Sequence, residues 1–347
     1  MGSLPSNLLT LPLFDVRSPG EFAAGHIPGA HSLPVLSDAQ RAEVGTLYKQ
    51  QGAQIAWDRG LELVGPRLIE LVREVRQLMQ RHDSPLVRVM CWRGGMRSRS
   101  VAWLLQQAGF QVEILPGGYK SWRRAILKLF AQPWNWRVFG GPTGSGKTAL
   151  LHALHAQGTQ VLDLEALASH RGSAFGDIGL PRQHSQEHFE NLIGAQLLQM
   201  DSARPLCVED ESRMIGVLKI PDPLFHGLQQ APMMILDVPK VVRIQRLVDE
   251  YGTLPKESLV EAVHKLRKRL GIEACLRCVD AIQQGRLEDA VERLLHYYDR
   301  TYEHGLHKQT GSSERCIWDH TDLPIDVFLR WIDAAALPSG QEAHLLV

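Results

Sequence analysis

The chain has 347 residues, more than one typical folding core needs, and 44% of them are hydrophobic, which is enough to bury two cores. Lys and Arg number 38, as do Asp and Glu, so no overall basic field favours a nucleic-acid partner. Five scattered cysteines, an odd number, argue against a disulfide framework. The chain begins with no charged-then-apolar leader and has no uncharged apolar run of about 18 residues, so we expect a cytoplasmic protein with no membrane partner.

The first 130 residues have the pattern of an α/β domain that uses a cysteine. Residues 38–82 predict a polar helical insert, the apolar run at 86–90 predicts a strand, and residues 100–105 return to helical spacing. The loop between them, residues 91–98, reads Cys-Trp-Arg-Gly-Gly-Met-Arg-Ser. Cys91 therefore stands near a helix N-terminus, where the helix dipole, the loop amides and the side chains of Arg93 and Arg97 would lower its pKa. This pattern predicts a thiolate nucleophile rather than a packed thiol.

A more specific pattern follows at residues 141–148, where Gly-Pro-Thr-Gly-Ser-Gly-Lys-Thr matches the phosphate-binding P-loop. Residues 136–139 predict a strand before it, and residues 149–154 predict a helix after it. In this motif the backbone N–H groups face phosphate oxygens at a helix N-terminus, the lysine adds a charge, and the last hydroxyl can reach a magnesium ion. We therefore predict a phosphate or diphosphate site formed by Gly141, Gly144, Ser145, Gly146, Lys147 and Thr148.

Two more predicted strands end in acidic residues. One is residues 160–165, Gln-Val-Leu-Asp-Leu-Glu, and the other is residues 205–209, which continues into Asp210 and Glu211. Ligands of parallel sheets bind at the carboxyl ends of strands, and P-loop proteins keep a magnesium-orienting carboxylate there. We expect Asp210 or Glu209 to hold magnesium together with Thr148, and no metal held by the protein alone. Acids at 163 and 165 are weaker candidates because acids also cap helices.

Residues 256–271 carry five Lys and Arg against two Glu, a local charge of +3. RNA phosphates could dock on Lys265, Arg267, Lys268 and Arg269, although a solvated helix face is an equally common role for such residues. Tyrosines at 297, 298 and 302 could stack on bases, but this helical spacing is more often core packing. Cysteines at 275 and 278 have no second pair at suitable spacing, so zinc is not expected.

Three segments resemble the entry and closing parts of a rhodanese domain: residues 15–22, residues 25–34, and residues 115–119 with Trp122. The resemblance covers about residues 8–130 and implies a rhodanese-like α/β fold in which Cys91 accepts sulfur or selenium. Common rhodanese loops read C-x-x-x-x-R, whereas the spacing from Cys91 to Arg97 is one residue longer. A longer loop makes a wider cradle, so a tetrahedral phosphate-bearing ligand is also plausible.

Four further segments, at residues 163–165, 170–176, 189–191 and 209–213, together with the two loops resemble the bacterial tRNA 2-selenouridine synthase family. The resemblance implies an α/β fold with an N-terminal rhodanese-like domain at 8–130 and a P-loop NTPase-like parallel-sheet domain with C-terminal helices at 136–335. It implies replacement of sulfur by selenium in wobble 2-thiouridine of tRNA through an S-geranyl-2-thiouridine intermediate. Geranyl diphosphate and selenophosphate would be co-substrates, and an enzyme that produces selenophosphate is a possible partner. His170, Arg171 and Arg213 then become candidate substrate contacts.

Two alternatives remain open. An ATP-dependent kinase or sulfurtransferase with a rhodanese domain would use the P-loop for nucleotide and Cys91 for persulfide. A non-catalytic module that senses phosphate-containing ligands is less favoured, because a pure binder needs no nucleophile. Within the favoured interpretation, Cys91 either forms a covalent bond to selenium or only binds selenophosphate.

Overall fold

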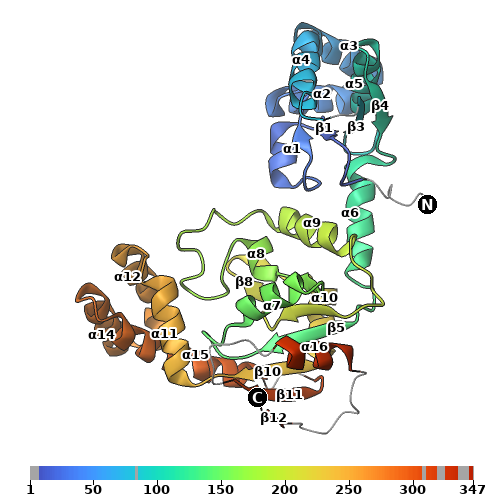
Figure 1. Cartoon of the computed structure of the whole chain (residues 1–347). Coiled ribbons are helices and arrows are strands. Elements are labelled where there is room, and N and C mark those ends of the chain that lie inside the picture. Colours follow the sequence, from blue (N-terminus) through green and yellow to red (C-terminus); the bar gives the residue numbers. More distant parts are fainter. Residues whose placement is uncertain (1–7, 83–84, 307–309, 319–324, 335–343, 347) are drawn as a thin grey trace. The chain divides into compact units, whose positions relative to one another are not determined.

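The computed structural model describes residues 8–82, 85–306, 310–318, 325–334 and 344–346 (Figure 1). The chain divides into two compact units, each described here by itself. The first comprises Met1–Leu129 with Ser185–Leu198, and the second comprises Phe130–His184 with Gln199–Val347. Among the described residues, every helix is too short or too polar to cross a bilayer.

The first unit is built on a four-stranded parallel sheet in the order β2-β1-β3-β4. Its strands are β1 (Leu13–Asp15), β2 (His31–Ser32), β3 (Leu86–Met90) and β4 (Gln111–Ile114). The connections include α1 (Pro19–Ala24), α5 (Met96–Gln107) and α6 (Gly118–Leu129). The predicted helical insert is confirmed as α2 (Asp38–Gln50), α3 (Ala53–Val64), a 3₁₀ turn (Gly65–Arg67) and α4 (Leu68–Met79). Phe14, Leu71 and Val89 belong to the buried core that joins sheet and helices.

A helix from later in the chain completes the first unit. In α9 (Gln186–Leu197), the fully buried Asn191 accepts hydrogen bonds from Trp122 Nε1 (2.9 Å) and from Arg123 (3.0 Å). Its amide nitrogen donates to the Tyr119 hydroxyl (2.7 Å) and to the His26 carbonyl (2.8 Å). This segment lies within the predicted second domain (136–335), whereas its contacts assign it to the first unit. The reason is physical, since a buried amide must find its partners there.

The second unit contains a six-stranded parallel sheet in the order β12-β11-β10-β5-β7-β6. Its strands are β5 (Trp136–Gly140), β6 (Gln160–Leu162), β7 (Leu206–Glu209), β10 (Met233–Asp237), β11 (Ser313–Ile317) and β12 (His344–Leu346). Helices near the sheet are α7 (Lys147–Ala156), α8 (Leu164–Ala168), α10 (Asp222–Gln230), α11 (Lys240–Tyr251) and α16 (Ile325–Asp333). A small antiparallel pair, β8 (Met214–Ile215) and β9 (Leu218–Lys219), follows β7. The predicted combination of an N-terminal rhodanese-like fold and a parallel-sheet P-loop fold is thus observed.

A group of C-terminal helices forms a further core around Leu259, Val263 and Cys278. These helices are α12 (Lys256–Lys265), α13 (Arg267–Leu270), α14 (Ile272–Gln283) and α15 (Leu287–Leu306). The basic segment expected as one helix is therefore two, separated at Leu266, whose side chain is buried in this core. The basic residues consequently do not share one continuous helical face.

The strand predicted at residues 160–165 is shorter than expected. β6 stops at Leu162 because the Asp163 side chain accepts a hydrogen bond from the Ala166 amide (2.8 Å) and caps α8. Glu165 therefore lies in the first turn of a helix. The capping role that weakened the sequence argument for Asp163 is the one observed.

Candidate functional site

The loop after β3 holds Cys91 just before α5. Its sulfur lies 3.3 Å from the Ser98 hydroxyl and accepts a hydrogen bond from the Gly95 amide at 3.3 Å. Burial raises the pKa of the Cys91 thiol, but hydrogen bonds from the Ser98 hydroxyl and from the amides of Arg93, Ser98 and Gly95 outweigh burial, so the pKa falls below its ordinary value. The loop therefore lowers the pKa of this thiol, the direction that the sequence predicts, and the role of Cys91 as a nucleophile stays a prediction.

The role expected of the two arginines in this loop needs correction. Arg97 donates to the Glu21 carboxylate at 2.7 Å rather than to the cysteine, and the side chain of Arg93 is exposed. The Glu21 pKa is lowered because hydrogen bonding and attraction from Arg97 outweigh its burial. Arg97 is thus neutralised by a carboxylate, and the donors that stabilise the thiolate are a hydroxyl and loop amides.

The predicted closing segment of the rhodanese-like unit packs directly against this loop. The Tyr119 amide donates to the Cys91 carbonyl at 2.9 Å. Gly118 has φ of +58°, and a Cβ at that position would lie 2.2 Å from the same carbonyl oxygen, so only glycine fits. The Tyr119 ring lies 3.8 Å from the Arg17 guanidinium, and its hydroxyl donates to Glu187 of α9 at 2.7 Å. Helix α9 therefore supports the segment that shapes the cysteine loop.

The predicted P-loop joins β5 to α7 in the second unit. Lys147, the first residue of α7, donates to the Gly141 carbonyl at 3.0 Å. Arg246 of α11 donates to the Ser145 carbonyl at 2.8 Å, and its guanidinium lies 4.3 Å from the ring centre of Trp318. A second cation, which the sequence did not reveal, thus stands beside the loop.

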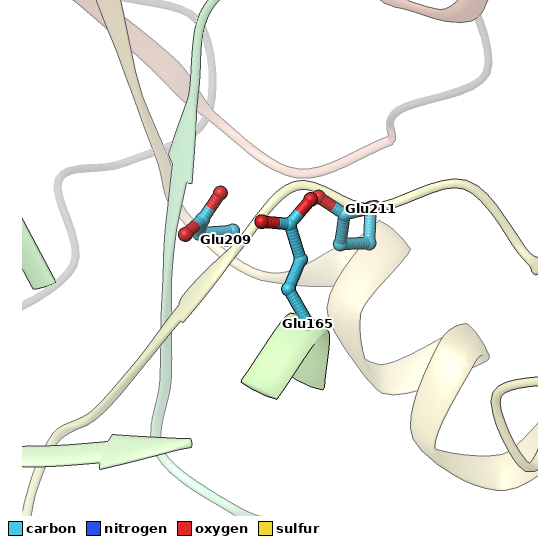
Figure 2. A group of neighbouring side chains, drawn as sticks. All are labelled: Glu165, Glu209 and Glu211. Atoms are coloured by element: carbon cyan, nitrogen blue, oxygen red, sulfur yellow. The ribbon is translucent and has the colours of Figure 1, made fainter. Parts of the chain in front are cut away.

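Three glutamates meet next to the P-loop, and we call them the glutamate triad (Figure 2). Glu165 extends from the start of α8, Glu209 ends β7, and Glu211 follows it, with oxygens of the three carboxylates within 4.8 Å of one another. Burial raises the pKa of all three. Repulsion adds to this effect, from other triad members for Glu165 and Glu211 and from Asp163 for Glu209. In the part of the chain that the structure describes, this is the one cluster of metal-ligating side chains whose geometry could hold an ion.

The P-loop and the triad line a cavity of about 2140 Å³ in the second unit. Most of the predicted site residues line the same cavity: Gly141, Gly144, Gly146, Lys147, Thr148, His170, Arg171, Asp210, Arg213, Lys265, Lys268 and Arg269. Of the residues predicted in the second unit, Ser145, which is fully buried, and Arg267 lie outside this lining. Residues far apart in sequence therefore surround one space that could take a phosphate-bearing ligand.

Several of the predicted substrate contacts already have protein partners. Three cations lie beside acids: Arg171 by Glu250 (3.4 Å), Arg213 by Asp222 (2.6 Å) and Lys265 by Asp177 (3.2 Å). His170 is buried, and burial lowers its pKa, which favours the neutral ring. A phosphate ligand would have to compete with these acids for the three cations.

Four residues that contact these loops have no signal in the sequence that we used, and one of them is Arg243, which donates to the Thr143 carbonyl at 3.1 Å. Ser98 contacts the Cys91 sulfur, Arg246 reaches the P-loop, and the Tyr302 hydroxyl accepts a hydrogen bond from the Gly141 amide at 2.7 Å. Ser98 could have been suspected from its place at the start of the helix after the cysteine. Arg246 and Tyr302 could not, because helical residues that reach a loop far earlier in the chain leave no local pattern.

Comparisons with known proteins agree with this architecture. A family model described as the tRNA 2-selenouridine synthase AAA domain matches residues 134–261, and one described as a rhodanese-like domain matches residues 4–125. A protein named tRNA 2-selenouridine synthase from Psychromonas ingrahamii is 35% identical, with 87% of this chain and 90% of that protein covered. Proteins of the same name from Serratia proteamaculans and Bdellovibrio bacteriovorus are 37% identical (87% and 89% covered) and 43% identical (70% and 64% covered). The chain therefore belongs to the tRNA 2-selenouridine synthase family.

Proposed function

We propose that this chain is a tRNA-modifying transferase that replaces the sulfur of wobble 2-thiouridine with selenium, through an S-geranyl-2-thiouridine intermediate. Membership of the family supports the tRNA-modifying activity. The observation that carries the chemistry is the second unit's cavity, where an intact P-loop faces enough space for a diphosphate and a nucleotide together.

The first step is alkylation of the thiocarbonyl sulfur. That sulfur attacks the first carbon of geranyl diphosphate, the carbon–oxygen bond breaks, and diphosphate leaves. Amides of the P-loop at the start of α7, with Lys147 and the neighbouring Arg246, stand where they can stabilise the charge that develops on the leaving group. The proposal includes a magnesium ion held by Thr148 and Asp210, which both line the cavity, with diphosphate oxygens completing its shell.

The second step replaces the alkylated sulfur. The selenium of selenophosphate attacks the ring carbon, the carbon–sulfur bond breaks, and the S-geranyl group takes up a proton and departs as a neutral thiol, a better leaving group than the original sulfur. Water then attacks phosphorus, the phosphorus–selenium bond breaks, and phosphate leaves. Cys91 handles the selenium donor, either as a thiolate nucleophile or as part of an anion cradle for selenophosphate. The lowered pKa of Cys91 and the amides directed at its sulfur support both roles.

The tRNA needs a basic docking surface, and the second unit offers one at the cavity. Lys265, Lys268 and Arg269 line the cavity that the P-loop also lines. Phosphates bound there would bring the RNA backbone to the alkylation site. This arrangement supports a docking role over that of an ordinary solvated helix face.

Mass spectrometry of wobble nucleosides tests the proposal directly. Native protein incubated with thiolated tRNA, geranyl diphosphate and selenophosphate should produce selenouridine, and omission of selenophosphate should leave geranylated thiouridine. Cys91→Ser should still alkylate the tRNA but form no selenouridine. If geranylated thiouridine also vanishes in the folded variant, the division of labour between the loops is wrong. Strong ATP turnover without tRNA would instead favour an ATP-dependent kinase or sulfurtransferase.

A further inference from the structure

Glu209 is a buried carboxylate in which one oxygen lacks a hydrogen-bond donor in the described part of the chain. Its side chain is only 5% exposed, and among the described residues its Oε1 atom has no hydrogen-bond partner. The same carboxylate belongs to the glutamate triad, so its free acceptor lies among two other carboxylates. A buried carboxylate oxygen without a hydrogen-bond partner is costly, and three neighbouring carboxylates are more so when they are ionised. Protons or a bound cation can neutralise the triad, and the raised pKa values indicate that protons do so when no cation is bound.

The neighbouring lysine supplies only part of that charge. Lys147 attracts all three carboxylates, but its ammonium donates to the Gly141 carbonyl, and one positive charge cannot balance three acids. The Thr148 hydroxyl also assists Glu209 through a hydrogen bond. When a cation displaces the protons of the triad, three ionised carboxylates face this one lysine, so the ion meets an excess of negative charge.

The oxygen donors of the triad suit a small, hard divalent cation. Carboxylate oxygens are the ligands that Mg²⁺, Mn²⁺ and Ca²⁺ prefer, whereas zinc favours nitrogen and sulfur. A glycine also covers the cluster: Gly172 has φ of +64°, and a Cβ there would lie 2.6 Å from Glu165 Oε1 and 2.9 Å from Glu211 Oε2. Any side chain at this position would press on the two oxygens, so glycine leaves the carboxylates free to hold an ion.

We propose that Glu165, Glu209 and Glu211 form a divalent-cation site that the protein fills before any phosphate ligand binds. The magnesium ion proposed at Thr148 and Asp210 needs diphosphate oxygens to complete its shell, whereas this ion would be held by the three glutamates alone. We also expect the bound ion to support phosphate binding at the P-loop, and this part of the inference rests on the proposed function. Binding of the ion itself depends only on the three side chains.

The test is a titration of the full chain with Mn²⁺ in the absence of nucleotide, diphosphate and RNA. Electron paramagnetic resonance measures the concentration of free Mn²⁺ at each point of the titration. One Mn²⁺ should bind, and Glu165→Gln or Glu211→Gln should each weaken binding at least roughly tenfold, since even removal of groups that only support metal ligands has effects of that size. Glu250→Gln is the matched control, because Glu250 lines the same cavity and pairs with Arg171 outside the triad. Its Mn²⁺ affinity should equal that of the native chain.

Thermal unfolding gives a second measurement that does not depend on ligand chemistry. Without cation and at a pH above about 8, where Glu165 is ionised, Glu165→Gln should unfold at a higher temperature than the native chain, because one of three repelling carboxylates is gone. Added Mn²⁺ should stabilise the native chain and the Glu250→Gln control but not Glu165→Gln. The inference is overturned if Mn²⁺ binds only after diphosphate is added, or if Glu165→Gln and Glu211→Gln bind it as well as the native chain. If triad-dependent binding is present but no geranylated nucleoside forms, the proposed function fails and the cation site stands.

Discussion

Replacement of Ser98 by alanine should raise the pKa of Cys91. The Ser98 hydroxyl lies 3.3 Å from the Cys91 sulfur and 3.0 Å from the Gly95 carbonyl, so its single proton is shared between two acceptors. A hydrogen bond to a charged group contributes about 1.5 to 3 kcal/mol, and about 1.4 kcal/mol corresponds to one pKa unit. Because the proton is shared and the amides still donate to the sulfur, we expect the low end of this energy range, which corresponds to a rise of about one pKa unit.

The pH dependence of Cys91 alkylation by iodoacetamide, followed by peptide mass spectrometry, measures this change. The native thiol has a lowered pKa, so its thiolate persists to lower pH than that of an ordinary cysteine, and Ser98→Ala should move the midpoint of the rate profile upward. Ser100→Ala is the control, because Ser100 is exposed on the same helix. An unchanged midpoint in a folded Ser98→Ala protein would show that the amides alone set the pKa.

Three further changes test other parts of the structure. Lys147→Ala should weaken geranyl diphosphate binding by about 1.5 to 3 kcal/mol in calorimetry, whereas unaltered binding together with tight native ATP binding would support the kinase alternative. Reversal of charge at Lys268 and Arg269 should weaken the binding of all substrate tRNAs about equally. The slope of log affinity against log salt concentration should become less steep by roughly 0.7 to 0.9 per lost phosphate contact. A slope equal to that of the native chain would exclude docking at these residues. Asn191→Ala should speed amide exchange in residues 186–197 by roughly 30-fold or more, since loss of its four buried hydrogen bonds costs at least about 2 kcal/mol. The exposed Gln186→Ala on the same helix should have little effect on that exchange.

The sequence predicted the parts of the molecule that depend on local pattern. The strand before Cys91, the helix after the P-loop and the insert at 38–82 each show a continuous apolar run or helical periodicity, and the structure has them. The residue pattern also indicated that acids would follow β7. These features were accessible because strand, loop and helix follow one another along the chain.

Contacts between distant segments could not be predicted in the same way. The triad forms because β6 pairs with β7, so the segments that follow both strands meet, and no single stretch of sequence records that pairing. The same limit applies to α9, whose partners in α6 lie nearly 70 positions earlier in the chain. Arg97 was expected to lower the pKa of Cys91 because both residues lie in one loop, but closeness in sequence does not reveal that Glu21 lies near enough to bind the arginine.

Although the net charge of the chain is zero, positively and negatively charged side chains line the same cavity. Arg246, Lys268 and Arg269 line the space that the three glutamates also line. A diphosphate at the P-loop would be attracted by the cations and repelled by any unneutralised carboxylate of the triad. If a divalent cation fills the triad, that repulsion becomes attraction, and the two ligands must favour each other's binding by the same factor. The acids near the P-loop would then make diphosphate affinity depend on the cation, although the P-loop amides themselves do not change.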